Sequence, residues 1–142
     1  MVNAKRKGSA WEREAVKILN NAFGERFKRV PGSGALGTML HESILVSDVK
    51  GKFNFLPRPI RIECKVGYGG SKQMTIKKEW LDKVKEEADS AYSFSMLMGK
   101  FSGAREGTKH FVVIDLNTFI DIMKIAEKQK AILDEVYDGK EN

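Results

Sequence analysis

Hydrophobic and polar positions near the start of the chain repeat with the period of an α-helix. Apolar residues return every three or four positions, at Trp11, Ala15, Ile18, Leu19 and Ala22. Ser9 is followed three positions later by Glu12, the spacing of a capping box, in which two side chains satisfy free amides at a helix start. The sequence therefore predicts an amphipathic helix over residues 9–24, with Glu12 in its first turn.

Three strand-like segments follow this helix. Residues 26–30 and 44–49 are short strand candidates separated by a glycine-rich loop, and residues 50–59 have the glycine and prolines of an irregular connection. Within residues 60–65 apolar and charged positions alternate strictly. Because successive side chains of a strand point to opposite faces, Glu63 and Lys65 are predicted to share one face.

A second helix, two more strands and a last helix are predicted in the rest of the chain. Thr75 is a candidate cap for a helix with an apolar stripe at Ile76, Trp80, Leu81, Val84 and Ala88. Residues 92–100 alternate as a strand, and residues 111–114 form the continuous apolar run of a strand covered on both faces. Asn117 is a candidate cap for the last helix. The predicted fold class is α/β, in the order α-β-β-β-α-β-β-α, with a central mixed sheet of about five strands flanked by helices.

We expect residues 1–142 to form a single domain, because a chain of this length can bury a core without disulfides or a structural metal. Residues 1–7 are expected to be a basic arm that either contacts phosphate or is an ordinary disordered terminus. Residues 117–142 are expected to be a helical extension.

Charge adds a preference for polyanionic partners. The net charge is +6, and residues 1–37 carry eight basic against three acidic side chains, whereas residues 121–142 carry four against six. A basic front attracts nucleic-acid phosphates, although charge alone does not decide the partner. The single cysteine, Cys64, cannot form an internal disulfide, and no apolar run of signal-peptide length follows the basic start. We therefore expect an intracellular, cytoplasmic protein.

Three acidic residues and one lysine are predicted to converge. Asp48 ends the second strand, Glu63 and Lys65 share a face of the third, and Glu12 lies at the start of the first helix. Mg²⁺ prefers oxygen ligands from one or two carboxylates together with substrate phosphate, and a nearby ammonium can oppose the charge that develops at phosphorus. This set of side chains therefore favours metal-dependent phosphodiester hydrolysis.

The same residues resemble a known motif. Ser47-Asp48 followed by Glu63-Cys64-Lys65 resembles the PD-(D/E)xK signature of restriction endonuclease-like nucleases. The flanking segments Gly-Ser-Ala-Trp-Glu-Arg-Glu, at residues 8–14, and Arg-Val-Pro-Gly-Ser, at residues 29–33, are similar to those of archaeal-type Holliday-junction resolvases. The resemblance covers roughly residues 7–101, which is most of the chain.

This resemblance implies a restriction endonuclease-like core and a homodimeric enzyme that cuts four-way DNA junctions with Mg²⁺ or Mn²⁺ and leaves 5′-phosphate ends, in an archaeal, bacterial or phage-infected cell. The implied catalytic residues are Glu12, Asp48, Glu63 and Lys65. The implied metal ligands are Asp48, Glu63 and the backbone carbonyl of Cys64, with Glu12 as a further candidate. The candidate DNA contacts are Lys5, Arg6, Lys7, Arg13, Arg29, Ser33, Lys72, Lys77 and Lys78.

Departures from the family pattern leave other substrates open. Ser47 occupies the proline position of the signature, and the segments on both sides of Asp48 are longer than the family pattern. One alternative is a PD-(D/E)xK nuclease that acts on other branched DNA or on duplex DNA. The other alternative is a non-catalytic, basic DNA-binding module with a structural acidic cluster.

Several of these residues also have simpler interpretations. Glu12 can serve the capping box without any metal, and Arg13 and Arg29 can be ordinary surface cations. Residues 32–37 match G-x-G-x-x-G, but a strand-like segment follows instead of the helix that a dinucleotide site requires, so we interpret them as a loop. Cys64 is expected to be a small apolar residue of the core.

Overall fold

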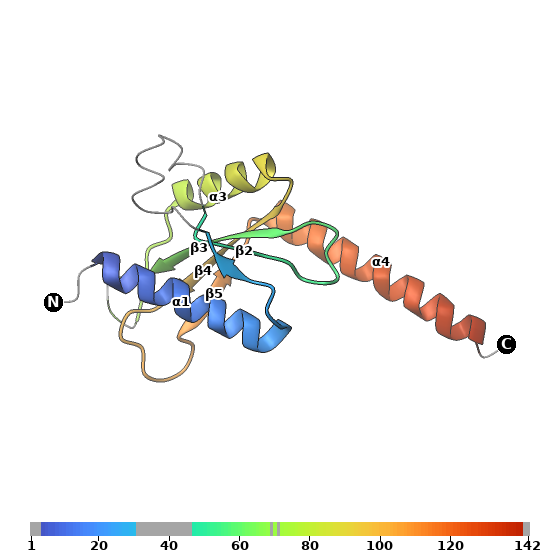
Figure 1. Ribbon diagram of the computed structural model, residues 1–142, viewed down its shortest axis with the longest axis horizontal. Helices are drawn as coiled ribbons and strands as arrows, with labels where there is room; N and C mark the ends of the chain where they lie inside the picture. The colour runs from blue at the N-terminus through green and yellow to red at the C-terminus, as the bar shows by residue number, and fades with distance from the viewer. Residues whose placement is uncertain (1–3, 31–46, 69, 71, 141–142) are drawn as a thin grey trace.

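The computed structural model describes residues 4–30, 47–68, 70 and 72–140, and the elements follow the predicted order (Figure 1). The elements are helix α1 (Ala4–Phe23), strands β1 (Lys28–Arg29), β2 (Val49–Gly51) and β3 (Ile60–Val66), helix α3 (Lys78–Ser90), strands β4 (Phe94–Lys100) and β5 (His110–Val113), and helix α4 (Leu116–Lys140). Residues 44–46 of the strand predicted at residues 44–49 lie outside the described residues.

The five strands form one mixed sheet in the order β1-β2-β3-β4-β5. Strands β3 and β4 are parallel, and the other neighbouring pairs are antiparallel. A parallel pair needs a crossover connection, which α3 provides between β3 and β4. The helices α1 and α3 lie on opposite sides of the sheet (Figure 1). The sheet and the helices described beside it confirm the predicted α/β class, with a central mixed sheet of five strands flanked by helices.

The alternation of β3 places different chemistry on the two faces of the sheet. Its even-numbered residues are buried and its odd-numbered residues are half-buried, as predicted. On the α1 face, Trp11 and Ala15 join the core that contains Ile62 and the buried Cys64. The Trp11 Nε1 donates a hydrogen bond to the Met98 carbonyl at 3.2 Å, which ties α1 to β4.

The opposite face of the sheet, toward α3, is less uniformly apolar. The buried residues Val84 and Ala88 of α3 lie on this side with the fully buried Leu97 of β4. Arg61 of β3 forms an ion pair with the buried Glu87 of α3 at 3.6 Å. This face also carries Glu63 and Lys65 and therefore positions the candidate site.

The first helix begins earlier than the capping box predicts. It starts at Ala4, so Ser9 lies inside the helix and the capping-box interpretation of Ser9 and Glu12 is wrong. The expected basic arm is helical from Ala4 onward. Lys7 donates a hydrogen bond to the Gly67 carbonyl at 3.0 Å and contacts the Ser102 hydroxyl. These tertiary contacts hold the added helical turns in place.

The other two predicted helix caps are also wrong. Helix α3 begins at Lys78 rather than after Thr75, and its N-cap residue makes no side-chain capping hydrogen bond. Helix α4 begins at Leu116, and Asp115 takes the role predicted for Asn117. The Asp115 carboxylate accepts hydrogen bonds from the Thr118 amide at 3.1 Å and from the Thr118 hydroxyl at 2.6 Å.

Three strand predictions need correction. Strand β2 begins at Val49, so Asp48 precedes the strand instead of ending it. Strand β4 begins at Phe94 rather than Tyr92, because Tyr92 has a φ of 51° and belongs to the preceding turn. Strand β5 is the last strand in the sheet order, and Val112 is 55% exposed, so the apolar run is not covered on both faces.

No helix in the described part of the chain is both long and apolar enough to cross a lipid bilayer.

Candidate functional site

The register of β2 against β3 brings together two acidic residues that are distant in the sequence. Val49 pairs with Ile62 in antiparallel register, so Asp48, just before Val49, lies on the same face as Glu63, just after Ile62. The Cys64 amide donates a hydrogen bond to the Asp48 carboxylate at 2.8 Å. The two carboxylates therefore meet on one side of the sheet, as the predicted site requires.

Asp48 occupies an electrostatically unfavourable position. Burial and the neighbouring Glu63 raise the pKa of Asp48 from 3.8 to about 8. Glu12 raises this pKa further, and the hydrogen bond from the Cys64 amide opposes the rise. The negative charge of Asp48 is thus only partly compensated by the protein. Such a carboxylate gains stability when a cation binds beside it.

Glu63 and Lys65 form an ion pair within the same strand. The Lys65 Nζ lies 3.2 Å from a Glu63 carboxylate oxygen. Burial raises the pKa of Glu63, and Lys65 and Lys83 oppose that rise. The Lys65 Nζ also lies 4.8 Å from the centroid of the Trp80 ring. Lys65 is therefore held between a carboxylate and an aromatic face, and its side chain remains 30% exposed.

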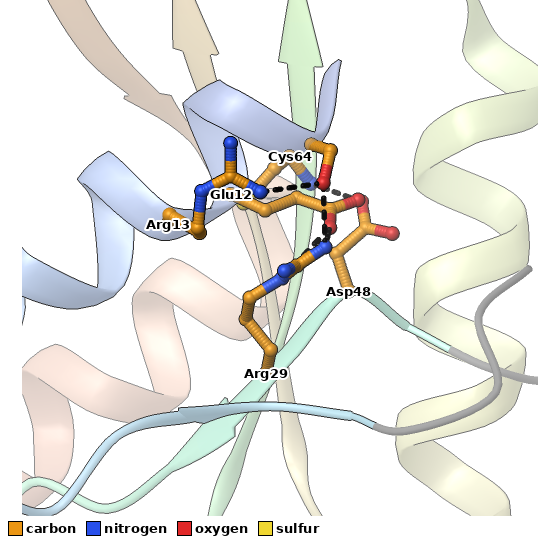
Figure 2. A network of polar contacts seen from close by, with 6 residues as sticks. Glu12, Arg13, Arg29, Asp48 and Cys64 are labelled. Atoms are coloured by element: carbon orange, nitrogen blue, oxygen red, sulfur yellow. Dashed lines mark hydrogen bonds and ion pairs between the residues drawn. The ribbon is translucent and has the colours of Figure 1, made fainter. Parts of the chain in front are cut away.

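Glu12 is bound by an arginine from β1. Arg29 donates to one Glu12 carboxylate oxygen from Nη2 at 2.6 Å and from Nε at 3.1 Å. The Ser9 hydroxyl accepts hydrogen bonds from Arg29 at 2.9 Å and from Arg13 at 3.0 Å. Figure 2 shows Arg29 reaching across from β1 to this acidic cluster, with Asp48 directed at the same place. The structure thus joins α1, β1 and β2 through one polar network.

The chemistry of these donors fits a divalent cation held by a pair of carboxylates. Asp48 and Glu63 are largely buried, repel each other and carry oxygen atoms, which are the ligands that Mg²⁺ prefers. Within the described residues, no three His, Cys, Asp or Glu side chains come together as a larger metal cluster. Glu12 is bound by Arg29 and also lies close enough to Asp48 to raise the pKa of that carboxyl group.

The predicted DNA contacts fall into two groups around the site. Arg6, Lys7 and Arg13 line an open groove of about 1010 Å³, together with Lys100 at the end of β4. On the other side, Lys77 lies 5.8 Å from the Trp80 ring centroid. In the same region, Lys72 is exposed and Lys78 pairs with Asp82 at 2.6 Å. The predicted contacts at Ser33 and at the Lys5 side chain lie outside the described residues.

Sequence reasoning missed two members of the site. Ser9 accepts from both arginines, and Lys83 of α3 acts on the Glu63 carboxylate. The spacing of Ser9 and Arg13, four positions apart on a helix, was an available signal for the first contact. Lys83 follows Trp80 by one helical turn, but its approach to Glu63 depends on how α3 packs against the sheet.

One family of known proteins matches nearly the whole chain. The family model described as "Phage putative PDDEXK endonuclease" matches residues 3–141. No curated protein matches the sequence. Among solved structures, the chain is similar to Hjc, a Holliday junction resolvase from Archaeoglobus fulgidus, with 15% identity, a TM-score of 0.48 and coverage of 77% of this chain and 84% of that chain. Because the family model spans nearly the whole sequence, the chain belongs to this phage PD-(D/E)xK endonuclease family.

Proposed function

We propose that the chain is a metal-dependent, structure-specific DNA endonuclease that resolves four-way junctions as a homodimer. The observation that carries this proposal is the meeting of Asp48 and Glu63, two largely buried acidic residues, beside Lys65. A cluster that served only the fold would pair Asp48, as well as Glu63, with a cation. Here the pKa of Asp48 is raised to about 8, which marks a site that lacks positive charge.

Asp48, Glu63 and the Cys64 backbone carbonyl would hold Mg²⁺, for which Mn²⁺ can substitute. When bound, such an ion polarises the phosphate and lowers the pKa of the attacking water. Glu12 is a further candidate ligand, and its use requires Arg29 to release it. The contribution of the chain is to place the carboxylate oxygens of Asp48 and Glu63 on one face of the sheet.

Lys65 orients the attacking water and offsets the negative charge that develops on the phosphate oxygens. Its exposed ammonium lies within reach of a substrate at the carboxylate pair because the Nζ is 3.2 Å from Glu63. Hydrolysis then forms a bond between the water oxygen and phosphorus and breaks the bond to the 3′ oxygen. The products are a 5′-phosphate and a 3′-hydroxyl.

The two basic regions beside the site supply the phosphate contacts of DNA. Arg6, Lys7 and Arg13 line the open groove next to the start of α1, and Lys77 and Lys78 lie at the start of α3. A duplex arm that crosses the acidic pair would meet both regions. The choice of a four-way junction rests on the motif resemblance, and a homodimer supplies the two sites that paired cuts require.

Cleavage of synthetic DNA substrates tests this proposal. We expect a four-way junction incubated with Mg²⁺ to be cut symmetrically, and Lys65→Ala to lower the rate by at least about 100-fold while retaining junction binding. The matched control is Lys85→Ala, which removes a half-exposed lysine that pairs with Asp89 at 3.8 Å. This control should cut like the unmodified protein.

The same experiment distinguishes the alternatives. Faster cutting of flaps, other branched DNA or plain duplex than of the junction would reassign the substrate and keep the nuclease. Metal-independent binding without cutting of any of these DNAs would make the chain a non-catalytic DNA-binding module.

A further inference from the structure

The second half of α4 is exposed along its length in the part of the chain that the structure describes. Every residue from position 127 to position 139 is exposed. Figure 1 shows this half of α4 extending away from the sheet to a distant C-terminus. A helix of this length is marginal in water by itself, because most helical stability in proteins comes from packing of an apolar face. The exposed half therefore needs a partner surface.

An apolar stripe runs along this exposed half. Its large members follow one another at helical spacing and are about half exposed or more: Ile132 (52%), Leu133 (54%), Val136 (48%) and Tyr137 (65%). The stripe continues the side of α4 that packs on the core through the buried Ile122 and the partly buried Ile125. The side of α4 that packs on the core thus continues past the sheet, where its apolar residues are exposed.

The charges on either side of the stripe are opposite in sign. Residues 124–130 contain three lysines and one glutamate, whereas residues 134–140 contain three acidic residues and one lysine. Two copies of this helix that lie antiparallel, centred near Ile132 and Leu133, place each basic half against an acidic half. A parallel pair would place like charges together. The pattern is therefore self-complementary in the antiparallel arrangement alone.

A groove on the body lies where the end of the second helix would arrive. It has a volume of about 470 Å³ and lies between the connection before β3 and the middle of α4. Its walls include Phe55, Pro57 and Ile125, together with the cations Lys52 and Lys128. In the antiparallel arrangement, the acidic end of the second copy, with Val136 and Tyr137, would lie along this apolar and basic groove.

We propose that the second halves of α4 from two copies of this chain pair antiparallel across a two-fold axis near Ile132 and Leu133. The pairing is isologous, because each copy presents the same apolar stripe and the same charge gradient. It deepens the proposed function by naming the surface that makes the homodimer. A chain that remains monomeric in the tests below would leave the stripe to be covered by a different protein instead.

The mass of the full-length chain in solution, measured by sedimentation equilibrium, tests the pairing through charge reversal. In the antiparallel arrangement Lys130 of one copy faces Asp134 of the other. Lys130→Glu and Asp134→Lys should each weaken self-association at least tenfold, because each creates like-charge pairs across the axis. An equimolar mixture of the two variants should restore a dimer, since opposite charges then face each other. The control is Lys109→Glu, at an exposed position on the connection between β4 and β5, and it should associate normally.

The mixture separates pairing between copies from effects within one helix. Lys130 and Asp134 also form an ion pair inside the same helix at 2.6 Å, and neither variant regains that pair on mixing. Recovery on mixing can therefore come only from contact between copies. Variants that dimerise as tightly as the unmodified chain would overturn the proposed surface and leave the homodimer standing.

Disulfide trapping gives an independent readout. Ile132→Cys lies near the proposed axis and should form a covalent dimer on mild oxidation. Asp138→Cys should not, because its counterpart in the other copy lies far along the helix. The natural Cys64 is buried and does not compete. If the unmodified chain remains monomeric at all concentrations and Ile132→Cys forms no crosslink, both the proposed homodimer and the proposed α4 pairing are wrong.

A different result would refute the nuclease proposal. If the unmodified chain dimerises and crosslinks as expected but cuts no DNA, the proposed function is wrong and the pairing stands. If the chain cuts and the pairing is correct, the charge-reversed variants should nick one strand of a junction more often than they make paired cuts, and mixing them should restore paired cuts.

Discussion

Replacing Asp48 with asparagine is expected to stabilise the folded protein and to abolish cleavage. Asparagine keeps an oxygen that can accept the hydrogen bond from the Cys64 amide, which Asp48 now accepts at 2.8 Å. It removes the charge that burial, Glu63 and Glu12 make unfavourable. Most substitutions of partly buried polar residues destabilise a protein, so a gain in stability here would identify a site kept for function.

The magnitude follows from the raised pKa of Asp48. The usual value of 3.8 applies to the unfolded chain, which has therefore lost this proton at pH 7, whereas the folded chain, with a pKa of about 8, mostly retains it. The folded state binds more protons over this range, so its stability falls as the pH rises from about 4 to about 8. At about 1.36 kcal/mol per pH unit, the loss by pH 7 has an upper limit of about 4 kcal/mol. Because the new amide must find its own partners, we expect a net gain of at least about 1 kcal/mol.

Urea unfolding in EDTA at pH 5 and pH 8 measures this effect. Asp48→Asn should raise the free energy of unfolding at pH 8 and have a smaller effect at pH 5. Asp89→Asn, at a carboxylate whose side chain is 66% exposed, should change it little at either pH. Added Mg²⁺ should stabilise the unmodified protein more than Asp48→Asn. Equal or lower stability of Asp48→Asn at pH 8 would refute the reasoning, because Asp48 would then be a compensated structural group.

Further predictions concern the packing and the arginine network. Gly99→Ala should destabilise the protein by about 1–3 kcal/mol, because a Cβ would clash with the Phe111 ring, whereas Gly8→Ala, with open space in α1, should stabilise it by about 0.5–1 kcal/mol. Thermal unfolding of both variants checks the pair, and the same sign for both would contradict it. Arg29→Ala should cost about 1–3 kcal/mol because it leaves the largely buried Glu12 unpaired. Arg13→Ala, at an exposed residue, should cost less than about 0.5 kcal/mol in the same urea assay.

Local spacing predicted the part of the site that lies on one strand. Glu63 and Lys65 are two positions apart, and the period of a strand alone places them on the same face. Their meeting with Asp48 depends on the register of β2 against β3, which is a long-range property. We expected that meeting from the predicted positions of the elements and from the motif resemblance, neither of which determines the register. The partner of Glu12 could not be predicted either, because Arg29 reaches it from another strand.

The wrong predictions have a common physical cause. Cap signals describe what a helix end prefers locally, but contacts of Lys7 with Gly67 and Ser102 extend α1 beyond Ser9. An apolar run such as residues 111–114 indicates a strand but not how many layers cover it. Whether β5 is central or at an edge is decided by the sheet order. In each case tertiary structure overrode a correct local preference.

The balance of charge in the site explains why the metal and the DNA should bind together. Among the described residues, the ion pairs of the three acidic side chains at Glu12, Asp48 and Glu63 involve two cations, Arg29 and Lys65. At about pH 9, above the pKa of Asp48 of about 8, and with all three ionised, one negative charge remains, which repels a phosphodiester. A bound divalent cation changes the net charge of the site from one negative to one positive charge. That positive charge attracts the single negative charge of a phosphodiester. Junction affinity should therefore rise when Ca²⁺ is added, measured by fluorescence anisotropy under conditions without cutting. The rise should be smaller in Asp48→Asn, because that variant already lacks the surplus negative charge, and an equal rise in both would place the cation elsewhere.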